Sequence, residues 1–226
     1  MAAGESAPAA KVDDGSESWG KKSRGRDQDN EVDRLIIQGY DFQDKQDYDG
    51  ACQAWGRLWD YLLLRLSPRM TSCALTLPLY DGSFELSNWM QNYCAVLHSA
   101  AFGSREMAGL GASFCDQVLL QFPDESALLL ENFRASLGEF LYLAGKHLEG
   151  EKVLSELIAE HPDRAIGYAC FSDMLGDARY HLDHHEPRDL SGAVEILEKG
   201  LAFPVQDAAD YNLDKRLERF REVLES

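Results

Sequence analysis

Three histidines that lie close together in the sequence form the candidate metal-binding group of this chain. His181, His184 and His185 follow Asp177 in the segment DARYHLDHHEP. On a continuous helix, His181 would lie one turn from His184 or His185, with Asp177 one turn earlier. Two imidazoles and a carboxylate in this arrangement suit Zn²⁺ or Ni²⁺. The segment is also acidic and ends at Pro187, so a solvated helix extension is the interpretation we favour.

The remaining motifs do not indicate catalysis. The chain has no G-x-S-x-G nucleophile motif and no G-x-x-x-x-G-K-[ST] phosphate loop. The Gly-Leu-Gly run at 109–111 falls inside a predicted helical hairpin and lacks the preceding strand of a dinucleotide site. We therefore expect a protein that is not an enzyme and needs no cofactor.

The charge of the chain limits its classes of ligand. Its 226 residues include 39 acidic and 22 basic side chains, which give a formal net charge of -17. Phosphate backbones repel such a chain, so we do not expect nucleic acid as its main ligand. No apolar run reaches the roughly 18–20 residues that a membrane span needs, and the N-terminus shows no apolar signal region. These features predict a cytoplasmic protein that does not act in a membrane.

The cysteine pattern agrees with a reducing compartment. The five cysteines are an odd number, and none of them forms a CxxC pair. A disulfide framework is typical of small secreted domains, which this chain does not resemble. We expect all five side chains to be thiols: Cys52, Cys73, Cys94, Cys115 and Cys170.

The segment 35–62, LIIQGYDFQDKQDYDGACQAWGRLWDYL, predicts two antiparallel helices joined by a tight turn. Small residues at Gly39 and Ala51 let the two helices cross closely. Large side chains such as Trp55 fill the space beside the crossing. Asp47 stands where the second helix should begin and is a candidate N-cap.

The same pattern recurs along the chain at about 92–125, 131–164 and from 165 onward. A last helix at about 207–224 has one apolar and one charged face, which suits a cap on an exposed end. An ordinary helical bundle with small residues at its crossings remains the alternative. The predicted close-crossing positions are Gly39, Ala51, Ser99, Gly111, Gly138, Gly150, Ser172 and Ala193.

Two segments do not follow the repeat. Residues 1–30 are poor in large apolar side chains, so we expect a disordered tail. Its basic run GKKSRGR at 20–26 would suit an acidic surface or a targeting signal, or is simply solvated. An irregular insertion covers 67–87, and a short hairpin and a packed loop both remain open for it.

The spacing of these small, aromatic and proline residues resembles the tetratricopeptide repeat. The resemblance implies an all-α, tetratricopeptide-like solenoid of about four helical hairpins plus a C-terminal capping helix, over residues 31–226. Such modules bind proteins or peptides in a concave groove. We therefore expect a non-enzymatic interaction module, with a metal-binding protein that uses the 177–185 cluster as the alternative.

A narrower resemblance covers about residues 31–225. The runs GYDFQDKQDYDGACQAWGRLWDYL, NWMQNYCAVLHSAAF and FPDESALLLENFRASLGEFLYLAG are similar to the helical region of bacterial SEC-C-motif proteins. In that family, a C-terminal motif supplies metal-binding cysteines and a histidine. This chain ends at FREVLES without such a motif, so the family's metal binding is not carried over to it.

The tetratricopeptide resemblance also predicts which residues line the groove, because fixed positions of each first helix face it. The charged residues at these positions are all acidic, and three tyrosines accompany them. We expect a groove for a basic, partly apolar peptide that carboxylates attract and tyrosines hold. Alternatively, the groove is acidic only because the whole chain is. The candidate partner-binding residues are Asp33, Tyr40, Asp44, Tyr93, Glu139, Tyr142, Asp173 and Asp177.

Overall fold

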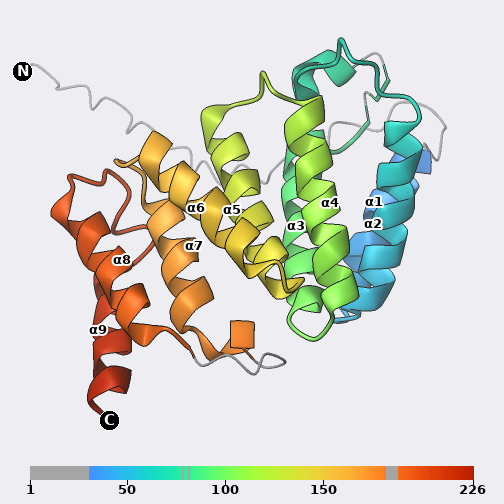
Figure 1. Cartoon of the computed structure of the whole chain (residues 1–226). Helices are drawn as coiled ribbons and strands as arrows, with labels where there is room; N and C mark the ends of the chain where they lie inside the picture. Colours follow the sequence, from blue (N-terminus) through green and yellow to red (C-terminus); the bar gives the residue numbers. More distant parts are fainter. Residues whose placement is uncertain (1–30, 78, 81, 182–187) are drawn as a thin grey trace, which may run out of the picture.

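The computed structural model of the protein describes residues 31–77, 79–80, 82–181 and 188–226. Within these ranges, every regular element is a helix (Figure 1). The predicted tail at 1–30 lies outside them, as do Pro78 and Asp81 of the insertion. The α-helices are α1 (Glu31–Gln43), α2 (Tyr48–Leu63), α3 (Leu86–Ala101), α4 (Arg105–Gln121), α5 (Ala127–Leu143), α6 (His147–Glu160), α7 (Ala165–Gly176), α8 (Leu190–Ala202) and α9 (Leu213–Glu225). Two short 3₁₀ helices are η1 (Cys73–Thr76) and η2 (Ala178–His181).

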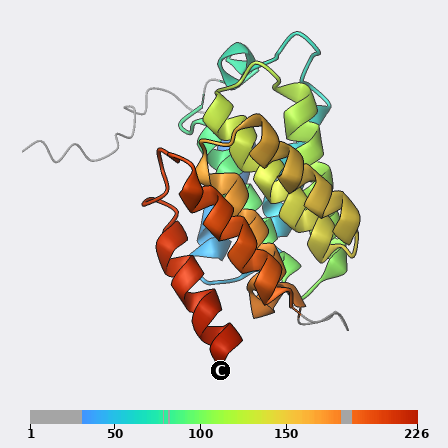
Figure 2. The same ribbon diagram turned by 60° about the vertical axis from the view of Figure 1, so that its left-hand side comes forward.

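Consecutive helices pack as pairs, and the pairs stack along the molecule. The helices α1 and α2, α3 and α4, α5 and α6, and α7 and α8 are in extensive contact within each pair. The odd-numbered helices also meet across the stack, α3 with α5, α5 with α7, and α7 with α9. Helix α9 packs on α8 at the C-terminal end of the stack (Figure 2). The predicted all-α solenoid of four hairpins and a capping helix is confirmed.

The crossing of α5 and α6 shows why small residues are needed. A Cβ atom added to Gly150 would lie 2.5 Å from the carbonyl oxygen of Gly138. A Cβ added to Gly111 of α4 would lie 2.3 Å from the ring of Phe140 in α5. Both glycines are buried. At Gly150 the backbones of α5 and α6 lie too close together for a Cβ atom, and at Gly111 the Phe140 ring takes the place of one.

The prediction for Ser99 is wrong. Its side chain is exposed, and its hydroxyl donates a hydrogen bond to the carbonyl oxygen of Ala95, at 3.0 Å. Ser and Thr often bond back to the preceding turn of their own helix, and no close crossing is needed for that. The large residues of α3 instead fill its contact face, where Trp89 and Leu97 are fully buried.

The first hairpin has the predicted N-cap and the predicted large side chain at its crossing. The Asp47 carboxylate accepts a hydrogen bond of 2.9 Å from the backbone N–H of Gly50, so Asp47 is the N-cap of α2. The Trp55 ring is fully buried, and its indole N–H donates to the carbonyl oxygen of Ile36, at 3.1 Å. This bond joins α1 to α2 through the largest side chain at their crossing.

The insertion between α2 and α3 is a packed loop. Its described residues contain the 3₁₀ helix η1 and no strand, so the hairpin alternative is wrong for them. The side-chain amide of Gln121 donates to the carbonyl oxygens of Ser67 and Met70, both at 3.0 Å. The backbone N–H of Cys73 donates to the carboxylate of Glu125, at 2.8 Å. These bonds attach the loop to the end of α4 and to the segment that follows it, and α3 begins at Leu86.

No helix in the described part of the chain combines the length and the apolar character that crossing a membrane requires.

Candidate functional site

The candidate groove residues of α1 contact the insertion and the neighbouring helices. The Asp33 carboxylate accepts hydrogen bonds from the hydroxyl of Tyr80 and from the backbone N–H of Ser83. The Tyr40 hydroxyl accepts a bond of 2.8 Å from the side-chain amide of Asn92 in α3. Asp33 therefore holds the insertion against α1, and Tyr40 joins α1 to α3.

Tyr40 and Asp44 both reach solvent. The Tyr40 ring lies edge-on to Trp55, with 5.1 Å between ring centroids, and keeps part of its surface in solvent. Asp44 is exposed in the turn that follows α1.

Tyr93 belongs to the hydrophobic core. It is only 6% exposed. Its ring stacks on Trp89 with a centroid separation of 5.9 Å, and it lies 4.7 Å from the ring of Phe114. Burial raises the pKa of the Tyr93 hydroxyl well above its usual value. This side chain fills the space between α2, α3 and α4, so it offers a partner almost no surface.

Asp173 of α7 is paired with the last helix. Its carboxylate forms ion pairs with Arg216, and with Arg219 at 3.1 Å. The side chain of Asp173 is 15% exposed, and both of its arginine partners belong to α9. Helix α9 therefore docks on α7 through one of the predicted groove carboxylates.

Asp177 follows α7 and forms a local pair. Its carboxylate lies 3.1 Å from the guanidinium of Arg179 and accepts a bond from the backbone N–H of the same residue. Burial alone would raise the pKa of Asp177, but the hydrogen bonds and the charge of Arg179 hold that pKa below its usual value. Asp177 thus stays ionised and fixes the start of η2.

Glu139 lies at the centre of a buried polar cluster. The residue is 8% exposed and lies in the C-terminal half of α5. The Tyr180 hydroxyl, from η2, donates a hydrogen bond to its carboxylate. The Nε2 atom of His98, on α3, lies 3.2 Å from the Tyr180 oxygen and 3.6 Å from the Glu139 carboxylate. Because the hydroxyl donates to Glu139, its oxygen is free to accept from an Nε2–H of His98.

Burial dominates the electrostatics of this cluster. It raises the pKa of the Glu139 carboxyl, while the charge of His98 and hydrogen bonds from Tyr180 and Cys170 oppose that rise. Burial also raises the pKa of the Tyr180 hydroxyl and of the Cys170 thiol, and the Glu139 charge raises both further. The hydroxyl and the thiol therefore keep their protons at neutral pH and act as hydrogen-bond donors to Glu139.

Aromatic side chains enclose the ring of Tyr180, which is only 2% exposed. The ring lies edge-on to Phe102 at 5.2 Å and to Tyr142 at 6.5 Å, measured between centroids. The guanidinium of Arg179 lies 5.0 Å from the centroid of the same Phe102 ring. We call the four residues that surround the Tyr180 side chain the tyrosine pocket: His98, Phe102, Glu139 and Tyr142.

The histidine cluster does not have the predicted geometry. Asp177 has extended backbone angles, φ -80° and ψ 129°, so the helix does not continue from α7 to His181. The Nε2 atom of His181 lies 3.1 Å from the carbonyl oxygen of Met174, at the end of α7. His184 and His185 lie outside the described residues. Within the described ranges, no three potential metal ligands lie close enough to hold an ion.

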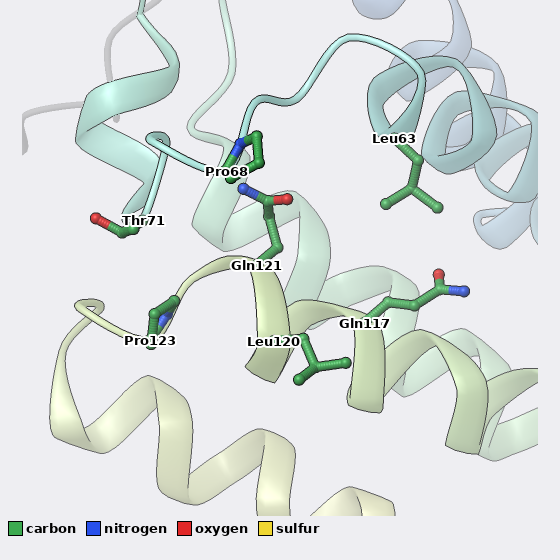
Figure 3. A pocket seen from close by; sticks show the side chains of 7 residues that line it. All are labelled: Leu63, Pro68, Thr71, Gln117, Leu120, Gln121 and Pro123. Atoms are coloured by element: carbon green, nitrogen blue, oxygen red, sulfur yellow. The ribbon is translucent and has the colours of Figure 1, made fainter.

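A shallow hollow of about 300 Å³ lies between the insertion and α4 (Figure 3). Its polar side chains already have partners. Gln121 holds the loop carbonyls described above, and the side-chain oxygen of Gln117 accepts a 2.6 Å bond from the indole of Trp59. Leu63, Leu120 and two prolines supply apolar walls. The hollow thus lies where the insertion is attached to α4, and its two glutamine side chains already form hydrogen bonds within the protein.

The residue spacing predicts Glu139 and Tyr142 as site residues but does not predict Tyr180, His98 or Phe102. The signal for Tyr180 was weak, a tyrosine inside a polar insertion that interrupts the fourth hairpin. Periodicity identifies the residues that face a neighbouring helix, but it does not show where an irregular segment lands.

No protein-family model matches the chain, and no curated protein sequence matches it. Among solved structures, the chain is similar to the TPR domain of P58(IPK), with 13% sequence identity and a TM-score of 0.35. The match covers 86% of this chain and 66% of that one. At this score the similarity adds nothing to the fold that the helices themselves establish. The resemblance to SEC-C-motif proteins remains a prediction.

Proposed function

We propose that this protein is a non-enzymatic interaction module that binds a protein or peptide on the side of the solenoid formed by the odd-numbered helices. One observation carries the proposal: carboxylates on these helices hold tyrosine and arginine side chains from other parts of the chain. Asp33 binds the hydroxyl of Tyr80, and Glu139 binds that of Tyr180. Asp173 binds the guanidinium of Arg216.

The same groups suit a partner that is basic and aromatic. Carboxylates form charge-assisted hydrogen bonds with guanidinium groups and accept bonds from tyrosine hydroxyls. The net charge of -17 favours encounter with a basic partner and disfavours nucleic acid. A basic peptide with exposed tyrosine or arginine side chains is therefore the ligand that the surface fits best.

Only some of the candidate residues can be mutated to test binding without disturbing the fold. Tyr93 lies in the core, and we leave it out of the proposed surface. Glu139 and Asp173 are paired internally, so reversing their charge would disturb the protein itself. Asp44 is exposed and can be changed without removing a buried contact. Tyr142 is only 4% exposed and is left out for the same reason as Tyr93, so Asp33, Tyr40 and Asp177 complete the proposed surface.

The test is to isolate a partner from the native host with the immobilised full chain, identify it by mass spectrometry and purify it. Its affinity is then measured for wild type, for Asp44→Lys and for Asp116→Lys. Asp116 is also an exposed acidic residue, but it lies on the even-numbered helix α4 and serves as the matched control.

We expect Asp44→Lys to weaken binding several-fold and Asp116→Lys to leave it unchanged. Binding should also weaken with added salt, because exposed charges are screened over about 10 Å at 0.1 M. Equal affinity for all three proteins, together with no salt dependence, would contradict the proposal.

A further inference from the structure

We infer that the tyrosine pocket is the binding site for a tyrosine of the protein partner, and that Tyr180 fills this pocket in cis until the partner displaces it. The inference rests on the proposed function and deepens it, because it names the side chain that the surface recognises.

The pocket is built to receive a phenol. Its walls come from α3 and α5, which pack on each other in the middle of the stack. Glu139 accepts the hydroxyl proton, His98 lies 3.2 Å from the hydroxyl oxygen, and Phe102 contacts the ring edge-on. A phenylalanine would remove the hydroxyl donor from the buried carboxylate and the hydroxyl oxygen from the imidazole. Glu139 and His98 would then keep only their mutual contact at 3.6 Å and the Cys170 thiol. Sites that bind a hydroxyl reject the analogue that lacks it for this reason.

The surroundings of the pocket favour a basic residue directly before the tyrosine. Arg179 precedes Tyr180, and its guanidinium lies over the ring of Phe102 and beside the carboxylate of Asp177. Cation–π contact and ion pairing both stabilise an arginine at that place. The cis segment therefore shows the kind of partner sequence that the site accepts, which is a basic residue followed by tyrosine.

Of the segments held on this side of the molecule, η2 is the one that a competitor can replace. Tyr180 is its single buried residue, whereas Ala178 and Arg179 are exposed. Helix α9, in contrast, buries Leu213, Leu217 and Phe220 against the stack. Displacing η2 removes one buried aromatic side chain and the contact of His181 with the end of α7, while displacing α9 would open the core.

Glu139 also excludes a phosphorylated tyrosine. A phosphate group carries between one and two negative charges near neutral pH, and burial beside a carboxylate makes their repulsion costly. The pocket therefore accepts the free hydroxyl and rejects the phosphate ester.

The experiment uses a fluorescent peptide with the sequence GDARYHL, which is that of residues 176–182. Its binding to full-length wild type and to Tyr180→Ala is measured by fluorescence anisotropy. With the cis tyrosine removed, Tyr180→Ala should bind at least about tenfold more tightly than wild type. Peptides with alanine, phenylalanine or phosphotyrosine in place of the tyrosine should each bind Tyr180→Ala at least about tenfold less tightly.

Three further variants control the result. Tyr48→Ala removes an exposed tyrosine and should bind the peptide as weakly as wild type does. Adding Glu139→Gln to Tyr180→Ala should weaken peptide binding, since the carboxylate acceptor is lost. If circular dichroism shows that Tyr180→Ala is unfolded, Tyr180→Phe keeps the ring, loses the hydroxyl and should bind the peptide more tightly than wild type.

Equal binding of the peptide by wild type and by the folded position-180 variant, or no preference for tyrosine over phenylalanine, would overturn the inference. Absence of peptide binding by that variant would overturn it as well. The proposed function would survive either result if a purified partner still distinguished Asp44→Lys from Asp116→Lys. If the partner bound Asp44→Lys and Asp116→Lys equally but the peptide bound as expected, the tyrosine pocket would be supported and the acidic binding surface would not.

Discussion

The hydroxyl of Tyr180 donates a hydrogen bond to the carboxylate of Glu139, although 41 positions separate the two residues in the sequence. This contact places an irregular segment on the side of the solenoid where we propose that partners bind. It gives Glu139 a donor that replaces part of its lost hydration. The contact is thus both a stabilising feature of the free protein and a template for a ligand.

Tyr180→Phe should loosen η2 without unfolding the helices. The loss of a hydrogen bond to a charged group costs roughly 1.5–3 kcal/mol, which corresponds to about a tenfold or larger increase in local opening. Hydrogen exchange of the backbone amides at 178–181 should rise accordingly, while exchange in α5 and α7 stays unchanged. Tyr48→Phe, at an exposed position, is the control and should exchange like wild type. Identical exchange in both variants would show that the Tyr180 hydroxyl does not stabilise η2.

Glu139→Gln should change how stability depends on pH. Burial raises the folded pKa of Glu139 above its reference value of 4.5, against the opposing effects of His98, Tyr180 and Cys170 and with the support of the Asp173 charge. A raised folded pKa contributes stability below the unfolded pKa and loses it as pH rises through the folded pKa. Glu139→Gln has no carboxyl group to ionise at this position, so its stability does not fall in this way as pH rises.

Urea unfolding of both proteins from about pH 5 to 8 measures the effect as the difference between their free energies of unfolding. The free energy of unfolding of Glu139→Gln, taken relative to that of wild type, should increase as pH rises. A difference that stays constant, or that moves in favour of wild type, would contradict the burial of an ionisable Glu139.

Gly150→Ala should destabilise the α5–α6 crossing. The new methyl group would meet the backbone of Gly138 at 2.5 Å, and backbone cannot rotate away as a side chain can. Overpacking of this kind costs about 1–3 kcal/mol. Gly109→Ala is the matched control, because an added Cβ there meets nothing within 4 Å and alanine favours a helix by roughly 0.5–1 kcal/mol. Thermal melts should therefore move in opposite directions, and a shared direction would refute the close crossing.

Gly138 and Gly150 also show which contacts can be predicted from the sequence. The small residues at Gly138 and Gly150 predicted a crossing because helix periodicity fixes which positions face a neighbour. The same reasoning gave a wrong prediction for Ser99, because a small polar residue also suits an exposed helix face. Asp173 and Glu139 were placed on the correct helices, but their partners lie 43 and 41 positions away. Such contacts depend on where a loop or a terminal helix folds back, which local spacing does not encode.

The cysteines should titrate as five thiols in denatured, unreduced protein. All five are free in the structure, although the sulfur atoms of Cys94 and Cys115 lie 3.8 Å apart in the core. Burial raises the pKa of Cys52 to about 12 and that of Cys115 well above its usual value. Because the thiolate is the reactive form, both should react slowly in the native protein at neutral pH. A denatured count of three or fewer would show that the chain folds in an oxidising compartment.

The most direct measurement follows the side chain at position 180 itself. Full-length protein with 3-fluorotyrosine at this position reports its environment by ¹⁹F NMR. The free protein should give a resonance displaced from that of the denatured chain, because the ring is buried among aromatic side chains. Excess unlabelled GDARYHL peptide should move the resonance to the denatured position, and the peptide with alanine in place of tyrosine should not. A resonance at the denatured position in the free protein, or one that stays displaced while the tyrosine peptide binds, would contradict a pocket that Tyr180 and a partner share.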